Sequence, residues 1–316
     1  PTQQRTVNDV ATPPETVPKA AKVELLGRID DAARSAGSAI VQVSAGYGDS
    51  RKRVLVANSD GLIATDDVVR VMVRISAVAS GDTGMQTGFE SMGHTVGWEA
   101  FEAGSKWHVD VEELAREAAR QALVKLVARP APSGAMPVVI RNGTGGVLFH
   151  EACGHGLEAD HIQKGASVYA GKVGELVASP LVTLVDDGTM AGEWGTLAID
   201  DEGHPTQRNV LIENGVLTDY MWDYLRSRKE GRAPSGNGRR QSYMHLPMVR
   251  MTNTFVLDGA DDPDDIVAAT DHGVYVSHLG GGSVNTATGD FVFGMREAYL
   301  IEDGEITEPL REGNLI

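Results

Sequence analysis

The chain of 316 residues has little cysteine, few basic residues and no long apolar run. Its single cysteine, Cys153, excludes a framework of disulfides and is typical of a protein from a reducing compartment. No apolar stretch approaches the length of a membrane span, so the sequence predicts a soluble protein with no membrane segment. The 28 Lys and Arg residues are outnumbered by 44 Asp and Glu residues, which gives a formal net charge of −16. Because phosphate binding needs clustered basic side chains, this charge argues against nucleic acid as a main partner.

Length and hydrophobic content bound the size of the folded protein. With 41% hydrophobic residues, the chain can bury one large core or two medium ones. No signal peptide opens the sequence and its first residue is Pro1 rather than Met, so we expect a processed or trimmed chain. Residues 1–18 are polar and contain prolines, which predicts a tail or linker. We expect residues 19–134 to form an N-terminal α+β portion and residues 135–316 to form a second portion.

Hydrophobic spacing predicts two long helices and several strands in the first portion. Residues 19–35 have helical periodicity, and residues 111–127 have it more clearly, with acidic residues early in the segment. Strands are expected at residues 39–43, 53–57 and 68–79, with a hairpin turn at 58–61. The expected apolar stripe of the first helix consists of Val23, Leu26, Ile29 and Ala33.

The second portion is predicted to be mostly β. A short strand at residues 135–140 leads into a helix with two histidines, and one more short helix is expected at 261–270. Several apolar runs end in acidic sequences with glycine, which are typical of hairpin turns. These sequences are Asp186-Asp187-Gly188, Glu213-Asn214-Gly215 and Glu302-Asp303-Gly304. Since helices and strands come in blocks without regular βαβ alternation, we predict the α+β class with extensive antiparallel sheet.

The most informative stretch of the chain is an H-E-x-x-x-H pattern from His150 to His155. It is one residue longer than the H-E-x-x-H of common zinc proteases. Residues at i and i+5 of a regular α-helix are about 140° apart around its axis, so the two histidines could not both reach one metal ion. A wide i→i+5 turn would bring them together, and such π-type turns occur mostly at functional sites. Gly154 and Gly156 flank His155 and lower the cost of this distortion.

Two imidazoles and a carboxylate at this spacing indicate metal-assisted hydrolysis. His150 and His155 are suitable zinc ligands, and Glu151 would be the general base that acts on a water molecule. The alternative is a partly buried helix with two unrelated histidines. Cys153 is expected to be a buried packing residue and is a weaker candidate for a metal ligand.

Several motifs occur in the order found in one protein family. Residues 146–160 (GVLFHEACGHGLEAD) resemble the signature of the TldD/PmbA family, on its metal-bearing TldD side. Further matches are VDDGT (185–189), IDDEG (199–203), LIENG (211–215), GNGRR (236–240) and RMTN (250–253). The resemblance extends from about residue 19 to the C-terminus and so covers nearly the whole chain.

The resemblance implies a TldD/PmbA-like fold and a cytoplasmic zinc metallopeptidase. Members of this family hydrolyse small or unfolded peptides, in peptide maturation or degradation, inside a closed dimeric chamber. The dimer is either a homodimer or a heterodimer with a metal-free subunit of the PmbA (TldE) type. Carried onto this sequence, the resemblance makes His150 and His155 zinc ligands and Glu151 the general base.

The resemblance also implies a third ligand, a cysteine in a Gly-rich C-terminal segment, that no residue of this chain matches. Cys153 does not occupy that position in the motif. Glu158, Asp160 and His161 are possible substitute ligands, although structural roles are favoured for each. The alternative function is therefore that of a metal-impaired or non-catalytic subunit, which binds or regulates within a TldD/PmbA-type complex.

Overall fold

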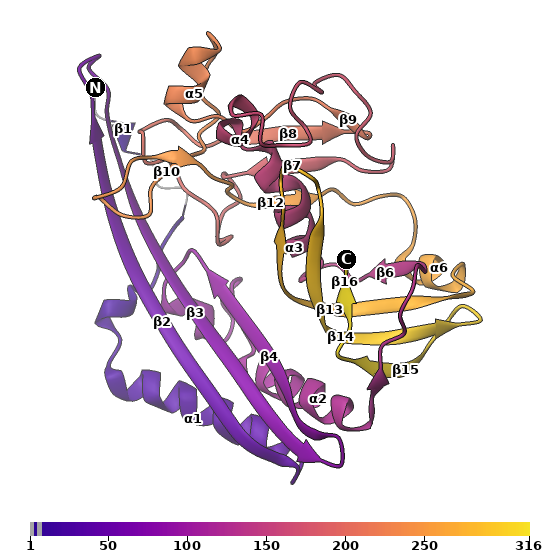
Figure 1. The fold of residues 1–316 in the computed structure, drawn as a ribbon. Coiled ribbons are helices and arrows are strands. Elements are labelled where there is room, and N and C mark those ends of the chain that lie inside the picture. The colour runs from indigo at the N-terminus through magenta and orange to yellow at the C-terminus, as the bar shows by residue number, and fades with distance from the viewer. Residues whose placement is uncertain (1–2, 5–7) are drawn as a thin grey trace.

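The computed structural model describes residues 3–4 and 8–316 and confirms the predicted α+β class (Figure 1). The first portion is built on an antiparallel sheet in which β3 lies between β2 and β4, and β1 adds to β3 in parallel. The strands are β1 (Gln3–Gln4), β2 (Ile40–Ala57), β3 (Ile63–Gly81) and β4 (Gly84–His94). Alternate residues of β3 are buried as predicted, which directs one face of the sheet toward a core.

Two helices, α1 (Lys19–Ser35) and α2 (Val111–Val127), cover that face and have the predicted bounds. In α1 the stripe differs from the one expected. Val23 is 66% exposed, whereas Leu25 and Ile29 are buried, because their i,i+4 spacing places them together against α2 and β3. Among the described residues, no helix is long and apolar enough to cross a membrane.

The prediction of two short strands at 39–43 and 53–57 was wrong, because β2 is continuous. Its middle, residues 44–52, contains glycines and charged residues that have low strand propensity. Nevertheless β2 pairs with β3 along its whole length, from Ile40 opposite Ala79 to Ala57 opposite Ile63. The ladder of hydrogen bonds to a buried neighbouring strand therefore overrides the local preference.

The expected tail at residues 1–18 is described only at 3–4 and 8–18, and its other residues lie outside the described part. The described residues of this segment are hydrogen-bonded to the rest of the first portion. Backbone N–H groups of Ala11 and Thr12 donate to the carboxylate of Glu99, and Trp98 N–H donates to the Thr12 carbonyl. Residues 8–18 therefore pack as part of the first portion.

The second portion, together with residues 129–130 of the first, forms two larger and mainly antiparallel sheets that flank the histidine-bearing segment (Figure 1). One has the strand order β5-β15-β14-β13-β6, with β16 added to β14, and the other has the order β12-β7-β8-β9. The six-stranded sheet consists of β5 (Arg129–Pro130), β6 (Val138–Ile140), β13 (His272–Val284), β14 (Phe291–Glu302), β15 (Glu305–Arg311) and β16 (Asn314–Leu315). The other sheet consists of β7 (Leu184–Asp187), β8 (Arg208–Glu213), β9 (Val216–Leu217) and β12 (Thr254–Val256).

Smaller elements complete this portion. β10 pairs with β11 in an antiparallel ribbon, and the helix expected at residues 261–270 is present in shorter form as α6. These elements are α4 (Ala159–Gln163), α5 (Tyr224–Lys229), α6 (Pro263–Ala268), β10 (Gly238–Arg239) and β11 (Met248–Val249).

Three of the four predicted hairpin turns are confirmed. Residues 58–61 join the antiparallel strands β2 and β3, with a hydrogen bond from the Asn58 N–H to the Leu62 carbonyl. Asn214-Gly215 and Asp303-Gly304 have positive φ at both positions, as a type I′ turn requires. The prediction at residues 186–188 was wrong because Asp186 lies inside β7. Its fully buried carboxylate accepts hydrogen bonds from the side chains of neighbouring strands and loops, so it anchors the sheet instead of turning the chain.

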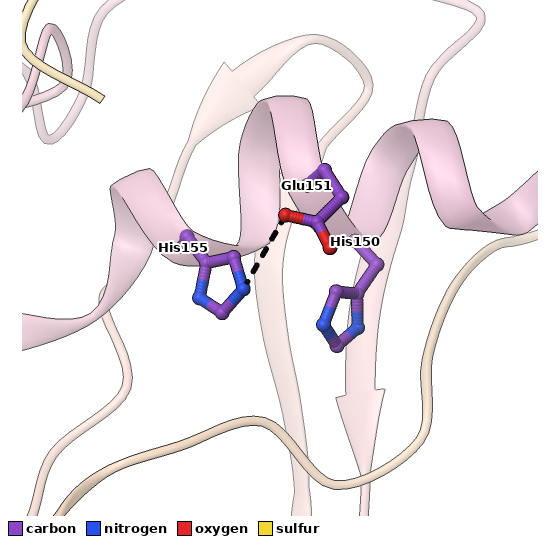
Figure 2. Close-up of side chains that lie close together, drawn as sticks. All are labelled: His150, Glu151 and His155. Atoms are coloured by element: carbon purple, nitrogen blue, oxygen red, sulfur yellow. Dashed lines mark ion pairs between the residues drawn. The ribbon is translucent and has the colours of Figure 1, made fainter. Parts of the chain in front are cut away.

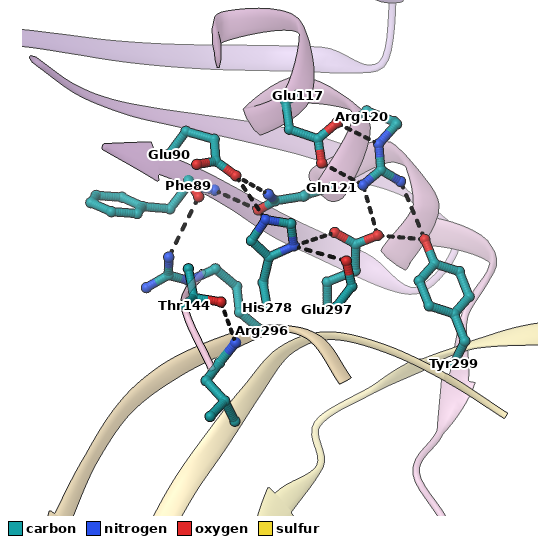
Figure 3. A network of polar contacts seen from close by, with 12 residues as sticks. Phe89, Glu90, Glu117, Arg120, Gln121, Thr144, His278, Arg296, Glu297 and Tyr299 are labelled. Atoms are coloured by element: carbon teal, nitrogen blue, oxygen red, sulfur yellow. Dashed lines mark hydrogen bonds and ion pairs between the residues drawn. The ribbon is translucent and has the colours of Figure 1, made fainter. Parts of the chain in front are cut away.

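A polar network ties the two portions together (Figure 3). The His278 imidazole on β13 lies between two carboxylates, with Nδ1 3.0 Å from Glu297 and Nε2 3.2 Å from Glu90. Arg120 on α2 lies 2.7 Å from Glu297 and 2.6 Å from Glu117. Because Glu90 and Arg120 belong to the first portion while His278 and Glu297 belong to the second, these pairs fix one portion against the other.

The network shifts the pKa values of its members in opposite directions. Hydrogen bonds to Glu297 and Glu90 raise the pKa of His278 to about 9. Burial alone would raise the pKa of Glu297, but the hydrogen bonds from His278, Tyr299 and Arg120 outweigh burial and lower it to about 2. Both groups are therefore charged in the folded protein near neutral pH.

We expect Glu297→Gln to reduce the free energy of unfolding by about 1–3 kcal/mol, because a buried acceptor loses its charge. The raised pKa of His278 stabilises the fold below pH 6.5, and this contribution is lost as the pH rises toward 9. The lowered pKa of Glu297 stabilises it above pH 4.5, and this contribution is lost as the pH falls toward 2. The difference between variant and wild type should thus be largest between pH 4.5 and 6.5. Urea unfolding across this pH range measures the difference in unfolding free energy. The control is Glu308→Gln, which removes a carboxylate from an exposed ion pair. Equal effects of the two substitutions would contradict the role of the network.

Candidate metal centre

The H-E-x-x-x-H segment has the wide turn that its spacing predicts. Helix α3 (Gly146–Phe149) continues into a π-helical turn at His150–Gly154 and then into a 3-10 turn at His155–Leu157. In the π-helical turn, the backbone N–H of His155 donates to the carbonyl of His150, five residues earlier. The extra residue places His155 back on the same side of the helix as His150.

The two glycines of the motif allow close packing of this turn. A Cβ on Gly154 would lie 2.1 Å from Met251 Sδ, and a Cβ on Gly156 would lie 2.8 Å from the Tyr169 ring. Gly154 has ordinary right-handed helical dihedrals, so it is needed for its small size and not for an unusual conformation. Met251 and Tyr169 thus hold the turn from outside, where any larger residue would push them away.

The segment is wedged between two hydrophobic cores. Val147 and Leu148 pack into the core formed by β13, β14 and β15, whereas Phe149 and Cys153 pack against the core around β7 and β8. Cys153 is partly buried, and burial raises the pKa of its thiol. Since metals bind the thiolate, both observations agree with the predicted packing role of Cys153.

The side chains of His150, Glu151 and His155 converge (Figure 2). Each offers one ligand atom, and these atoms lie within 4.8 Å of one another. The two imidazole rings have centroids 5.0 Å apart and are nearly perpendicular, and His155 Nε2 lies 3.6 Å from Glu151 Oε2. All three side chains are partly exposed, so a metal ion and a substrate could reach them. The arrangement is a donor set of the kind that zinc and similar ions accept.

The two histidines have different surroundings. Burial, together with the nearby His155, lowers the pKa of His150 and favours the neutral imidazole that a metal needs. A hydrogen bond to Glu158 raises the pKa of His155. Glu158 lies 3.2 Å from His155 Nδ1, on the nitrogen that does not face Glu151. Glu158 is therefore placed behind His155 and not among the three converging donors.

Two other groups of possible donors occur in the described part of the chain. Glu158, Asp160 and His161 form one, but Glu158 already contacts His155 and Arg250. Glu90, Glu117 and His278 form the other, in which carboxylates at 3.0 and 3.2 Å from the two imidazole nitrogens raise the pKa of His278 to about 9 and so keep it protonated near neutral pH. Such a protonated imidazole has no lone pair for a metal. Sequence reasoning did not find this second group, because its members are far apart in the chain.

Comparisons with known proteins show what this chain is similar to. The family model of the PmbA/TldA metallopeptidase central domain matches residues 12–126, and that of the PmbA/TldA metallopeptidase C-terminal domain matches residues 133–316. The chain belongs to the TldD/PmbA family. The predicted family resemblance is thereby confirmed.

Similar proteins include a metalloprotease TldD homolog from Haemophilus influenzae, 45% identical over 304 residues, which are 96% of this chain and 63% of that protein. A metalloprotease from Methanothermobacter thermautotrophicus is 38% identical over the full chain and 67% of its own length. This chain therefore spans only about two thirds of the length of such relatives.

Solved structures share the fold. A Thermotoga maritima protein, assigned provisionally as a modulator of a DNA gyrase, superposes with a TM-score of 0.82 at 24% identity, over 95% of this chain and 67% of that chain. TldE from Thermococcus kodakarensis superposes with a TM-score of 0.75 at 25% identity, over 91% of this chain and 63% of that chain. At these identities the likeness shows the TldD/PmbA fold alone.

We expect Gly154→Ala to destabilise the protein by about 1–3 kcal/mol, because the new methyl group overlaps Met251 in a packed region. Gly146→Ala in α3 is the matched control, since no atom lies within 4 Å of its added Cβ. It should be neutral or stabilising, because alanine favours a helix more than glycine does. Thermal unfolding of both variants measures the difference, and a stable Gly154→Ala protein would show that Met251 does not constrain the turn.

Proposed function

We propose that this chain carries the metal centre of a zinc metallopeptidase. The observation that carries the proposal is the convergence of His150, Glu151 and His155, which the π-helical turn makes possible. Relatives named metalloproteases support it, because they are similar over nearly the whole of this chain. The two imidazoles fit zinc, which takes nitrogen, sulfur and oxygen donors at tetrahedral sites, and Glu151 lies beside them where it can act on a water molecule.

In this proposal, His150 and His155 hold the zinc ion, and a third protein ligand is needed because catalytic zinc sites have three. When bound, zinc polarises the scissile carbonyl and makes a water molecule more acidic. Glu151 accepts a proton from that water as its oxygen attacks the carbonyl carbon. The C–N bond then breaks, and Glu151 delivers the proton to the leaving amine nitrogen. The carboxylate is thus restored at the end of each cycle.

We propose small or unfolded peptides as substrates, for maturation or degradation. Supporting this class, β2 pairs with β3 on one edge, and no described strand pairs with its other edge. An extended peptide can add to such an edge through backbone hydrogen bonds, which accept many sequences. An unfolded peptide adds more readily than a folded protein, because most backbone groups of a folded protein are already paired.

The proposed assembly is a dimer that encloses the substrate in a chamber, in the cytoplasm. The partner is a second copy of the chain or a PmbA/TldE-type subunit. The likeness to TldE supports the second possibility only in part, since it shows that such a subunit would have the same fold. The single cysteine is compatible with this location.

We expect Glu151→Gln to lower peptide cleavage by roughly 10²–10⁴-fold while bound zinc is retained, since the general base is lost but both imidazoles remain. His155→Ala should instead lose the metal. Metal content by mass spectrometry and cleavage of a fluorogenic peptide separate these effects. The control is Glu213→Gln at the exposed end of β8, which should cleave like the wild type.

Two results would change the proposal. Undiminished cleavage by pure Glu151→Gln protein would remove the general-base assignment. A wild-type protein, expressed at full length with its partner, that binds no zinc would favour the alternative of a non-catalytic or regulatory subunit.

The substrate class has a separate test. We expect an unstructured peptide to be cleaved at least tenfold faster than the same sequence inside a folded domain. Unfolding that domain by mutation should restore cleavage. Equal rates for the folded and unfolded forms would argue against recognition as an extended strand.

A further inference from the structure

The carboxylate of Glu158 is the most deeply buried charged group beside the metal centre. Its side chain is 0% exposed. One oxygen, Oε1, lies 3.2 Å from His155 Nδ1, and the other, Oε2, accepts a hydrogen bond from Arg250 Nη1 at 3.1 Å. Burial of an ionised carboxylate is costly unless it has partners of this kind. We therefore expect Glu158 to have a role beyond packing.

The backbone on either side of Glu158 is held as firmly as its side chain. Met221 N–H donates to the Leu157 carbonyl, and Ala159 N–H donates to the Met221 carbonyl, which locks residues 157–159 to the core segment at Met221. Met221 itself is 0% exposed. The carboxylate thus points from a fixed point in the core toward the imidazole.

Arg250 fixes the far side of this carboxylate. Its Nη1 group also donates to the carbonyl of Val249, which belongs to β11. Arg250 is 92 residues away from Glu158 in sequence, so the pair joins the histidine segment to a separate strand. Because one oxygen is taken by Arg250, only the other is available to His155.

We propose that Glu158, held by Arg250, is the positioning residue that directs His155 Nε2 toward the metal. A carboxylate can only accept a hydrogen bond, so the nitrogen that faces it, Nδ1, carries the hydrogen. The lone pair is then on Nε2, the atom that lies 3.6 Å from Glu151 Oε2. A carboxylate behind a metal-binding histidine fixes its ring and makes it a better ligand.

Glu99 provides a comparison outside this segment. It is also buried, at 6% exposed, and its carboxylate accepts backbone hydrogen bonds from Ala11, Thr12 and Gly97 of the first portion. None of these groups belongs to the histidine segment. Substitution of Glu99 therefore tests the loss of a buried, hydrogen-bonded carboxylate without a change at His155.

The inference rests on the proposed zinc site, and its experiment measures zinc binding apart from catalysis. We expect Glu158→Gln to weaken zinc affinity roughly 10–100-fold in competition with a chromophoric chelator. Arg250→Met should weaken it less, since Glu158 remains but is no longer held. Glu99→Gln should bind zinc like the wild type, even where it lowers thermal stability.

A spectroscopic readout separates positioning from stability. Nitrogen-15 spectra of the zinc-loaded wild type should show His155 coordinated through Nε2, with hydrogen on Nδ1. In Glu158→Gln, which keeps the size of the side chain, this preference should weaken. Unchanged zinc affinity in folded Glu158→Gln protein, or equal losses in the Glu99→Gln control, would overturn the positioning role. A full-length wild type, expressed with its partner, that binds no zinc would instead reject the proposed function, so the two failures are distinguishable.

Discussion

The hydrogen bond from His155 N–H to the His150 carbonyl is the constraint on which the site depends. A regular helix would direct the two imidazoles to different sides, and one inserted residue corrects this only if the helix widens locally. A π-helical turn is less stable than an α-helical one, so it persists only where the surroundings hold it. Here the two hydrophobic cores pack against opposite sides of the segment. Because Gly154 has no side chain, Met251 packs directly against the turn.

Features that depend on neighbouring residues could be predicted from sequence. The bounds of α1 and α2, the type I′ turns and the widened turn at His150 follow from spacing, from capping and from the special conformations of Gly and Asn. The convergence of the three motif side chains follows for the same reason. Each of these features depends on residues that lie within about one or two helical turns of one another along the chain. The local sequence is therefore enough to predict it.

Features that depend on distant residues could not be predicted in this way. The length of β2 is set by pairing with β3 and not by its own composition. The contact of Glu158 with Arg250 and that of His278 with Glu90 join segments 92 and 188 residues apart, and neither segment has a local pattern that names its partner. The sequence around Asp186 is typical of a turn. However, the four side-chain and backbone groups that donate hydrogen bonds to its carboxylate come from later strands and loops.

In the proposed site, His155 and Glu151 are held to different degrees. His155 is anchored from behind by a carboxylate that is itself buried and paired, which suits a ligand whose direction must not vary. Glu151 is partly exposed, and its contact with His155 Nε2 is long at 3.6 Å. A metal ion bound to Nε2 would replace this contact. The Glu151 carboxylate would then be free to turn toward water and toward a leaving amine. A general base needs this freedom, because it must meet two different atoms in one reaction.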